Sequence, residues 1–450
     1  MATNGNGQRR QPQTAQRTQT AHKPQVQKLQ PPATPAKPRK AKHPFYWMPM
    51  LVFATMFQLI SMMPVMFSAE ESEFEIFTVF GGFIIVEWLY FICARIFAKQ
   101  RATELEIIAF TLSGIGLVTV TSINPDYAMK QFVAILIGLA AFIALLAIMR
   151  NVEVITILRI PVAFMAVGLL GVNLVMAETV NGALNWITIG SFSIQPSELV
   201  KVAFIFVGAA TLEKLQSTRS LTGYLVFALG CVGALFLMRD FGTALIFFST
   251  FLVIAFMRSG DIKTIGLISV AAVLGAGLII YFKPYVASRF EAYRHVWEYA
   301  NESGYQQTRV LSYSASGGFF GLGIGEGKLR NVFASTTDLI FGVVCEEWGL
   351  VVGFCVILCF AFVAVYALRL ARHARSTVYS IAAVASAALL LVQLSLNVFG
   401  ITDLLPLTGV TLPFVSRGGT SMICSWALFA FIKSSDIKTY PILEKQMDDA

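Results

Sequence analysis

The chain has 450 residues, of which 56% are hydrophobic and only 13% are charged, and its formal net charge is +8. Soluble domains carry about 25% charged residues, so this composition excludes an ordinary water-soluble domain and predicts a polytopic membrane protein. The apolar runs are long and continuous, which favours membrane-spanning helices over the alternating strands of a β-barrel.

A basic tail over residues 1–45 is the first predicted element. It holds nine Lys or Arg residues, and the first acidic residue of the chain is Glu70. The tail lacks apolar periodicity and is rich in Gln, Pro, Thr and Ala, so we expect it to be disordered and to lie on anionic lipid headgroups. Its charge therefore does not indicate a nucleic-acid partner, and none is predicted.

Twelve membrane-spanning helices are predicted after the tail, because a span needs about 20 apolar residues. They cover residues 46–67, 75–97, 104–122, 129–149, 154–176, 197–215, 221–238, 242–257, 262–282, 338–368, 377–400 and 412–433. A C-terminal tail is predicted at 436–450. Two outer loops, 177–196 and 283–337, are too long to be simple connectors and are expected to be functional.

The charges of the loops predict the orientation of these helices. Every second loop is basic, as expected for the cytoplasmic side, so both termini are predicted to be cytoplasmic. The intervening loops carry acidic residues such as Glu70, Asp126 and Asp403. The large outer loop 283–337 is an exception, because it contains Lys283, Arg289, Arg294, Arg309, Lys328 and Arg330. An anionic ligand outside the membrane is one explanation for these cations.

No metal site is predicted from Cys or His residues. The six cysteines all lie in apolar stretches without ligand-like spacing, and the four histidines are scattered. Structural metal sites need several such ligands at short, regular spacings.

The first candidate site group is Gln195-Pro196-Ser197-Glu198, followed by Lys201. Pro196 suits the first turn of a helix, and Glu198 suits its positive N-terminal end. Glu198 and Lys201 are three residues apart, so they share a helix face and can pair. Ionisable residues beside a span are costly and often functional. The pair is either a salt bridge that only neutralises two charges or part of a substrate site.

Two further aspartates lie at the outer ends of predicted spans. Asp240 precedes Gly242 and Thr243, and a helix cap is the favoured interpretation for it. Asp338 lies where the large outer loop enters the membrane, and Glu346 is predicted about 12 Å deeper on the same helix. A carboxylate at this boundary can act as a general base; the alternative for Asp338 is again a helix cap.

The segment 406–421 is the strongest pointer to a site. Two prolines and three glycines break the helix at membrane depth. Such breaks are tolerated only where they are buried or line a polar cavity, and their exposed backbone groups can bind anions. In the outer loop, the glycine-rich run 316–325 carries interleaved hydrophobic residues, which predicts tight backbone packing rather than a flexible linker. The residues alone leave a transporter and an enzyme both open.

These motifs resemble those of the SEDS family (shape, elongation, division and sporulation), which includes FtsW, RodA and SpoVE. The similar segments are, in the family's order, 182–201, 240–244, 305–325, 336–349 and 405–421. The chain departs from the family pattern at Leu184, Asn185, Arg239, Val310, Thr336 and Arg417. The resemblance implies an all-α, ten-helix core at 104–435 in the bacterial cytoplasmic membrane, with the two helices in 46–103 as an addition.

The resemblance also implies the activity. Family members are peptidoglycan glycosyltransferases that polymerise lipid II into glycan strands outside the membrane, in division, elongation or sporulation, with a class B penicillin-binding protein (a transpeptidase) and other division or elongation proteins. Asp338 is the implied catalytic general base. The substrate-binding candidates are Trp186, Gln195, Ser197, Glu198, Lys201, Asp240, Gln306, Arg309, Lys328, Glu346, Ser416, Gly418 and Gly419.

The leaving lipid diphosphate needs positive charge. Lys201, Arg309 and Lys328 are the candidates, together with a divalent cation, Mg²⁺ or Mn²⁺. The alternatives are a lipid II flippase, an ion-coupled transporter and a non-catalytic scaffold for a partner synthase. Only a polymerase needs a base at the outer surface, which favours the enzyme. An ion-coupled transporter usually has matching broken helices in two halves, whereas this sequence shows one clear break.

Overall fold

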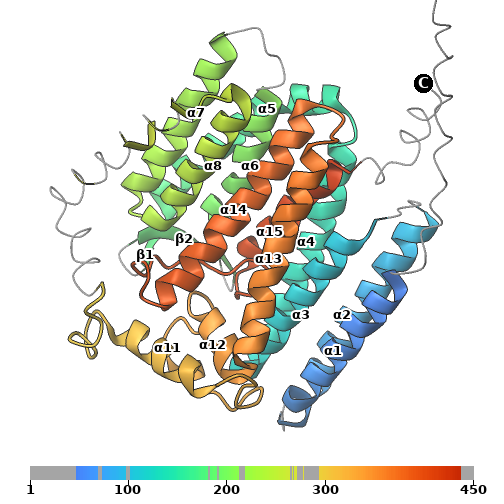
Figure 1. Cartoon of the computed structure of the whole chain (residues 1–450), viewed down its shortest axis with the longest axis vertical. Coiled ribbons are helices and arrows are strands. Elements are labelled where there is room, and N and C mark those ends of the chain that lie inside the picture. Colours follow the sequence, from blue (N-terminus) through green and yellow to red (C-terminus); the bar gives the residue numbers. More distant parts are fainter. Residues whose placement is uncertain are drawn as a thin grey trace, which may run out of the picture. The chain divides into compact units, whose positions relative to one another are not determined.

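The computed structural model describes residues 47–68, 73–97, 102–180, 183–189, 192–211, 218–263, 266, 268–270, 277 and 293–436. The predicted tail 1–45, the tail 436–450 beyond Asp436 and most of the predicted span 262–282 lie outside these residues. The described chain forms a bundle of long, roughly parallel helices (Figure 1).

Most helices of the bundle occupy the ranges expected for membrane spans. They are α1 (Trp47–Ser68), α2 (Glu73–Ile96), α3 (Glu104–Ile123), α4 (Ala128–Ile148), α5 (Val152–Met176), α6 (Pro196–Thr211), α7 (Thr218–Leu237), α8 (Phe241–Ser259), α13 (Gly349–Ala371), α14 (Thr377–Ile401) and α15 (Gly419–Ser434). Eight helices in the described part of the chain are long and apolar enough to cross a membrane. The predicted all-helical membrane fold is thereby confirmed.

The loops that were predicted to lie on the outer side carry short elements of their own. A 3₁₀ turn, η1 (Pro125–Tyr127), precedes α4. The loop 177–196, for which no strand was predicted, forms a small antiparallel sheet in the order β1 (Glu178–Val180), β2 (Ala183–Ile189) and β3 (Phe192–Ile194). The large outer loop contains α11 (Tyr305–Ser316) and a second 3₁₀ turn, η2 (Leu329–Asn331).

Two predicted spans are wrong in extent. The span 338–368 is two helices, the short α12 (Ile340–Glu347) and the long α13, which meet at Gly349. Gly349 has φ +87°, a conformation that glycine adopts without the steric cost of a Cβ. The span 412–433 begins only at Gly419, because residues 405–418 lack helical structure.

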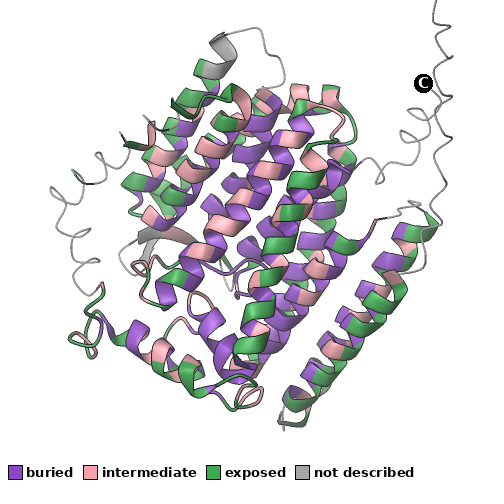
Figure 2. Ribbon diagram, in the orientation of Figure 1, coloured by how far each residue is buried: buried purple, intermediate pink, exposed green. Residues whose placement is uncertain are grey.

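An aromatic cluster fixes α15 in the middle of the bundle. The ring of Trp426 lies 5.0 Å from Phe110 of α3, 5.8 Å from Phe142 of α4 and 5.8 Å from Phe414, between ring centroids. Such edge-to-face contacts add about 0.5–1.5 kcal/mol each beyond the burial of apolar area. The burial pattern shows that this interior runs along α3, α14 and α15 (Figure 2).

The end of the bundle far from Gly419 is closed by a buried ion pair. Lys433 Nζ of α15 lies 3.0 Å from Glu106 Oε1 of α3. The hydroxyl of Tyr90 of α2 donates to the same carboxylate at 3.1 Å, and Lys433 also donates to the carbonyl of Ala102. Because every charge here has partners, the desolvation cost of burying them is offset.

The glycine-rich loop is packed tightly against α12, as the sequence predicts. Leu322 N and Gly323 N donate to the carbonyls of Glu346 and Glu347, at 2.9 and 3.1 Å. A Cβ on Gly321 would overlap the carbonyl oxygen of Glu347. The loop therefore caps the last carbonyls of α12, which have no partner within the helix itself.

Glu347 is a buried carboxyl at this junction, before the spanning helix α13 begins. It is 1% exposed, and Ser122 of α3 donates to its Oε2 at 3.0 Å. Burial away from water raises the pKa of Glu347 from its ordinary 4.5 to about 7. The hydrogen bonds from Gly325 and Ser122 lower the pKa, but by less than burial raises it. The folded protein thus holds a proton that the unfolded chain releases at lower pH.

We expect Glu347→Gln to stabilise the protein at pH 8 but hardly at pH 4.5. A carboxyl with a raised folded pKa contributes its full stability below about pH 4.5, and this contribution is lost as the pH rises to about 7. The gain at pH 8 is at most about 3 kcal/mol. Thermal unfolding in detergent, followed by tryptophan fluorescence at several pH values, measures it.

The exposed Glu326 of the same loop provides the matched control. Glu326→Gln should leave the pH dependence of unfolding unchanged. A stability difference for Glu347→Gln that is the same at pH 4.5 and pH 8 would contradict the assignment.

Candidate functional site

The start of α6 holds the first predicted site group. Pro196 occupies the first position of the helix, and Glu198 lies in its first turn. Lys201 Nζ lies 2.7 Å from Glu198 Oε1, so the predicted pair is present, and both side chains are nearly fully buried. A buried pair of this kind is maintained only where further hydrogen bonds complete the charged groups.

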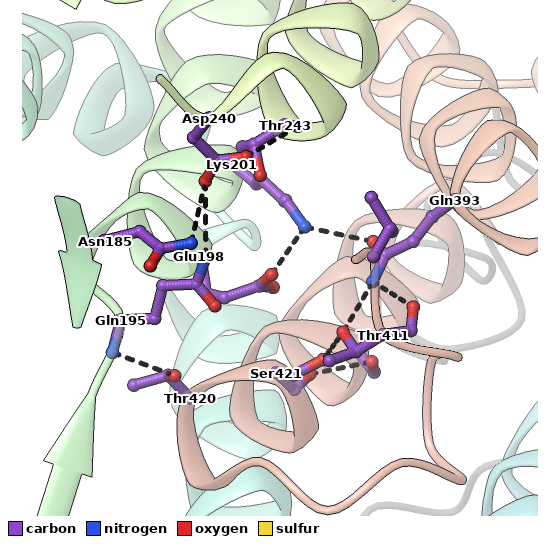
Figure 3. A network of polar contacts seen from close by, with 12 residues as sticks. Asn185, Gln195, Glu198, Lys201, Asp240, Thr243, Gln393, Thr411, Thr420 and Ser421 are labelled. Carbon is purple, nitrogen blue, oxygen red and sulfur yellow. Dashed lines mark hydrogen bonds and ion pairs between the residues drawn. The ribbon is translucent and has the colours of Figure 1, made fainter. Parts of the chain in front are cut away.

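Those further bonds come from α14 (Figure 3). Lys201 Nζ donates to Gln393 Oε1 at 3.2 Å. The amide nitrogen of Gln393 donates to the carbonyl of Thr411 at 2.9 Å and to its hydroxyl at 3.2 Å, and that hydroxyl is 2.9 Å from Ser421 Oγ. The ion pair of α6 is thereby connected through α14 to the broken segment 405–418.

Asp240 is the N-cap of α8, as the sequence predicts. Its Oδ1 accepts a hydrogen bond from Thr243 N at 3.1 Å. Its Oδ2 lies 3.5 Å from the side-chain nitrogens of Asn185 and Gln195. The capping aspartate therefore also joins the sheet loop to the start of α8.

The N-termini of three helices are connected at this point. Gln195 immediately precedes α6, and its side chain reaches Asp240 at the start of α8. Its backbone N–H donates to Thr420 Oγ1 in the first turn of α15 at 3.3 Å. Helix N-termini carry partial positive charge and free N–H groups, which favour anions. Among the described residues, Ser197 Oγ and Glu198 Oε2 are buried without a hydrogen-bond partner. These two oxygens are therefore available to form hydrogen bonds with a ligand.

Asp338 lies in the turn before α12, beside the broken segment. Its backbone carbonyl accepts from Asn397 Nδ2 of α14 at 2.8 Å. A Cβ on Gly409 would lie 3.4 Å from Asp338 Oδ2. The two residues before it are also held, because Thr337 O accepts from Ser416 Oγ and Thr336 O accepts from Arg417 N, both at 2.7 Å.

Asp338 is not the N-cap residue of α12. The N-cap position of α12 is Leu339, whose side chain makes no capping hydrogen bond. The partly exposed Asp338 side chain lies at the same end of the bundle as the start of α15. The general-base role of this carboxylate stays a prediction.

Sequence reasoning missed two amides of α14 that join the halves of the site. Asn397 lies one turn after Gln393, and its Nδ2 donates to the carbonyls of Asp338 and Val410, at 2.8 and 2.7 Å. Both amides are nearly fully buried inside a membrane-spanning helix. The sequence does contain a signal for them: an apolar span with a Gln and an Asn four residues apart, which places both amides on one helix face.

Arg417 was noted only as a departure from the family pattern, yet it lies beside the Asp338 segment. Its guanidinium carbon is 3.7 Å from the centroid of the Tyr127 ring. Its backbone N–H bonds Thr336, two residues before Asp338. A cation held over an aromatic face is positioned, so Arg417 joins Lys201 as a positive group of the site.

The remaining predicted residues are distributed less compactly. Gly418 and Gly419 lie at the start of α15, Ser416 lies in the broken segment before it, and Trp186 lies in β2. Gln306 donates to the carbonyl of Phe333, and Arg309 lies over the Tyr305 ring at 5.3 Å, both on α11.

Glu346 has a structural role. It is fully buried, and its two oxygens accept from the backbone of Lys328 and Leu329 at 2.7 and 2.9 Å. The exposed Lys328 side chain shows no bond to the α6 network. No contact in the structure supports a substrate role for Glu346 or Lys328, so these roles stay predictions.

Metal ligands are sparse at the site. In the part of the chain that the structure describes, no group of three or more His, Cys, Asp or Glu side chains is placed to hold a metal ion. A cage built from protein side chains for Mg²⁺ or Mn²⁺ is therefore not formed by these residues. The positive charge that the site itself provides comes from Lys201, Arg417 and the helix N-termini.

Comparisons with known proteins show what this chain is similar to. A family model described as "Cell cycle protein" and named for FtsW, RodA and SpoVE matches residues 103–440. Stage V sporulation protein E of Bacillus subtilis (strain 168) is 33% identical over 252 residues, or 54% of this chain and 68% of that protein. Peptidoglycan glycosyltransferase RodA of Mycobacterium leprae (strain TN) is 27% identical over 382 residues, or 78% of this chain and 82% of that protein.

The fold is also similar to a solved structure. The match is to a chain of "Structural coordination of polymerization and crosslinking by a peptidoglycan synthase complex", with a TM-score of 0.62 and 24% identity. It covers 74% of this chain and 96% of that chain. The matched family region begins after α1 and α2, so these two helices precede it.

We expect the Glu198–Lys201 pair to be dispensable for folding when both charges are removed together. Lys201→Met alone strands a buried carboxylate and should cost about 3–5 kcal/mol, whereas Glu198→Gln combined with Lys201→Met should be close to neutral. Two quantities are measured for each variant: the thermal unfolding of the protein and its turnover of lipid II, the substrate that the sequence predicts. Turnover of the double variant should fall by at least about tenfold if Lys201 stabilises charge on the substrate. A double variant with near-normal turnover would leave the pair only a structural role.

We expect Asn397→Leu to lower kcat far more than it changes KM. Leucine has a similar volume but cannot hold the carbonyls of Asp338 and Val410, and a misplaced reacting group costs about 10²-fold in rate. Ser386→Ala is the matched control, since Ser386 is a fully buried polar residue of the same helix. Equal loss of folded yield and of kcat would indicate that Asn397 only maintains the fold.

Proposed function

Because the chain belongs to the FtsW, RodA and SpoVE family of cell cycle proteins, we propose that it is a peptidoglycan glycosyltransferase of the cell membrane. It is a multi-pass membrane protein, and its substrate is lipid II, which it polymerises into glycan strands. The observation that carries this proposal is the position of Asp338, a partly exposed residue beside the broken segment. Its backbone carbonyl accepts from Asn397 of α14, and one turn earlier on the same helix Gln393 accepts from the buried Lys201.

Asp338 acts as the general base in this proposal. The sugar hydroxyl of the acceptor loses its proton to the Asp338 carboxylate as it attacks the anomeric carbon of the donor. The bond from that carbon to the lipid diphosphate breaks, and the diphosphate leaves with the bonding electrons. A positioned base contributes about 10²–10⁴-fold to the rate of such a step.

The leaving diphosphate is stabilised by the positive groups of the same region. Lys201 and Arg417 supply full charges, and the starts of α6, α8 and α15 supply N–H groups. Fixed donors of this kind stabilise developing charge without reorganising during the reaction. Arg309 of α11 stays a predicted contact. A divalent cation, if used, would be held mainly by oxygens of the diphosphate and would supply further positive charge.

The site faces the outer side of the membrane, and the N- and C-termini are cytoplasmic. Support comes from the loop charges and from Arg369 and Arg372 at the end of α13, opposite Gly349. The positive-inside tendency places such arginines in the cytoplasm. A class B penicillin-binding protein is the proposed partner, which crosslinks the strands that this chain produces.

The flippase and scaffold alternatives are less well supported. A flippase needs a polar path across the bilayer, whereas the end of the bundle around Lys433 is closed by the buried ion pair with Glu106. A scaffold has no need for a carboxylate held beside a broken helix. Both alternatives predict that removing the basicity of Asp338 leaves the protein's function intact.

We expect Asp338→Asn to abolish most polymerisation, with a loss of about 10²–10⁴-fold. Asparagine keeps the shape of the side chain but cannot accept the proton. Purified protein is incubated with lipid II, and the glycan products are resolved by gel electrophoresis. Folded yield and thermal unfolding should match the wild type.

Asp403→Asn is the matched control. Asp403 also lies at an outer end of a span and has φ +56°, a conformation that asparagine tolerates. Its Oδ1 accepts from Arg294 N at 3.2 Å, a bond that asparagine can also accept. If Asp338→Asn protein still produces long glycan strands at the wild-type rate, the catalytic assignment is refuted.

A further inference from the structure

The tip of the glycine-rich loop exposes two aromatic side chains. Phe319 is 70% exposed and Phe320 is 89% exposed, and Leu322 beside them is exposed too. Each lies next to a glycine with positive φ, since Gly318, Gly321 and Gly323 have φ +56°, +83° and +112°. Large apolar groups held in an ordered turn indicate a contact surface, because water alone gives no reason to present them.

Backbone hydrogen bonds fix this tip to the first turn of α13. Leu350 N donates to Gly318 O at 3.0 Å, and Val351 N donates to Phe319 O at 3.2 Å. The first residues of a membrane-spanning helix are thus capped by the loop itself. Phe319 and Phe320 therefore lie at the level where the apolar span of α13 begins.

The exposed face of α13 continues directly into the tip. Its exposed or partly exposed apolar residues recur at helical spacing on one stripe, namely Val351, Phe354, Leu358, Phe362 and Val365. That stripe is the lipid-facing side of a span, since the opposite side is buried in the bundle. Beyond the tip, Lys328 and Arg330 are exposed, and Arg330 Nη1 donates to Gly325 O at 2.7 Å.

We propose that the loop tip, defined by Phe319, Phe320 and Leu322, is a membrane anchor that inserts into the outer leaflet. Its occupant is the lipid surface: the apolar tip extends the lipid-facing stripe of α13, and the basic residues behind it meet anionic headgroups. An apolar patch flanked by Lys or Arg is the pattern of segments that bind in the membrane interface.

The anchor sets the depth of the catalytic segment, an idea that rests on the proposed function. The loop holds the last carbonyls of α12 through Leu322 and Gly323, and Glu346 of α12 holds Lys328 and Leu329 in return. Asp338 lies two residues before the start of that helix. Tip, α12 and Asp338 therefore move together, which keeps the base at the height of the diphosphate of a lipid-linked substrate.

Photo-crosslinking tests the lipid contact without requiring any activity. p-Benzoylphenylalanine replaces Phe320 in protein reconstituted into nanodiscs of phosphatidylethanolamine and phosphatidylglycerol, and adducts are identified by mass spectrometry. Position 362, in the middle of α13, is the positive control, and the exposed polar position 331 is the negative control. Lipid adducts at 320 and 362 but not at 331 are expected. Lipid adducts at 362 alone, or protein adducts at 320 once a class B penicillin-binding protein is added, overturn the proposal.

The functional consequence is tested with Phe319→Ser combined with Phe320→Ser. Lipid II turnover in nanodiscs should fall by about tenfold or more, because a base displaced by about 1 Å loses most of its effect. In detergent micelles, which have no leaflet to set the depth, the same variant should keep at least half of the wild-type rate.

Two further variants separate the possible failures. Phe333→Ser removes another exposed aromatic of the outer loop and should retain wild-type turnover in both media. Asp338→Asn should lose turnover in both media if the proposed function holds. Equal losses for the Phe319 and Phe320 variant in micelles and nanodiscs overturn the anchor, whereas an active Asp338→Asn variant overturns the catalytic proposal and leaves the crosslinking result intact.

Discussion

The structure depends on one constraint: the backbone of residues 405–418 is not helical, and its polar groups must be satisfied away from water. In a membrane, such groups cost several kcal/mol each when left unpaired. The protein satisfies them with side chains from elsewhere in the bundle. Gln393 and Asn397 bond the carbonyls of Thr411 and Val410, and Ser416 Oγ accepts from Leu412 N. Close approach from α3 is possible because Gly116 has no side chain; a Cβ there would lie 2.6 Å from the Val415 carbonyl oxygen.

The groups that satisfy the broken segment also assemble the site. Gln393 accepts from Lys201, Asn397 holds the Asp338 backbone, and Ser416 donates to Thr337. The same side chains therefore contribute both to fold stability and to site geometry. Phe414 has φ +63°, an unfavourable conformation for a bulky residue, and its ring is held by Trp426 and Phe429 at 5.8 and 4.6 Å. Strained backbone of this kind persists where surrounding packing maintains it, and it is concentrated at functional sites.

At the α12–α13 junction, polar backbone groups are also satisfied by a distant segment, but there the partners are backbone groups instead of side chains. The glycine-rich loop satisfies the end of α12 and the start of α13, which allows the chain to turn at Gly349 without leaving carbonyls or amides unpaired. Helix α1 reaches this turn as well, since the ring of Phe57 of α1 lies 5.7 Å from that of Trp348, whose Nε1 donates to Thr119 of α3 at 3.1 Å. The α12–α13 junction is thus held by the loop, by α3 and by α1.

The sequence alone determined the features that depend on local spacing and on solvent. Composition required a membrane environment, and runs of apolar residues located most spans to within a few residues. The three-residue interval placed Lys201 beside Glu198, an Asp before Gly-Thr identified the cap of α8, and the prolines and glycines of 406–421 identified the break. Only the tertiary structure decided that α12 and α13 are separate helices, that Glu346 supports a loop, and that Asn397 and Arg417 belong to the Asp338 region. The bond between Lys201 and Gln393 joins residues 192 positions apart. Periodicity describes only neighbours within a few turns of one helix, whereas the partner of a buried polar group is chosen by which distant segments the packed bundle brings within hydrogen-bond distance.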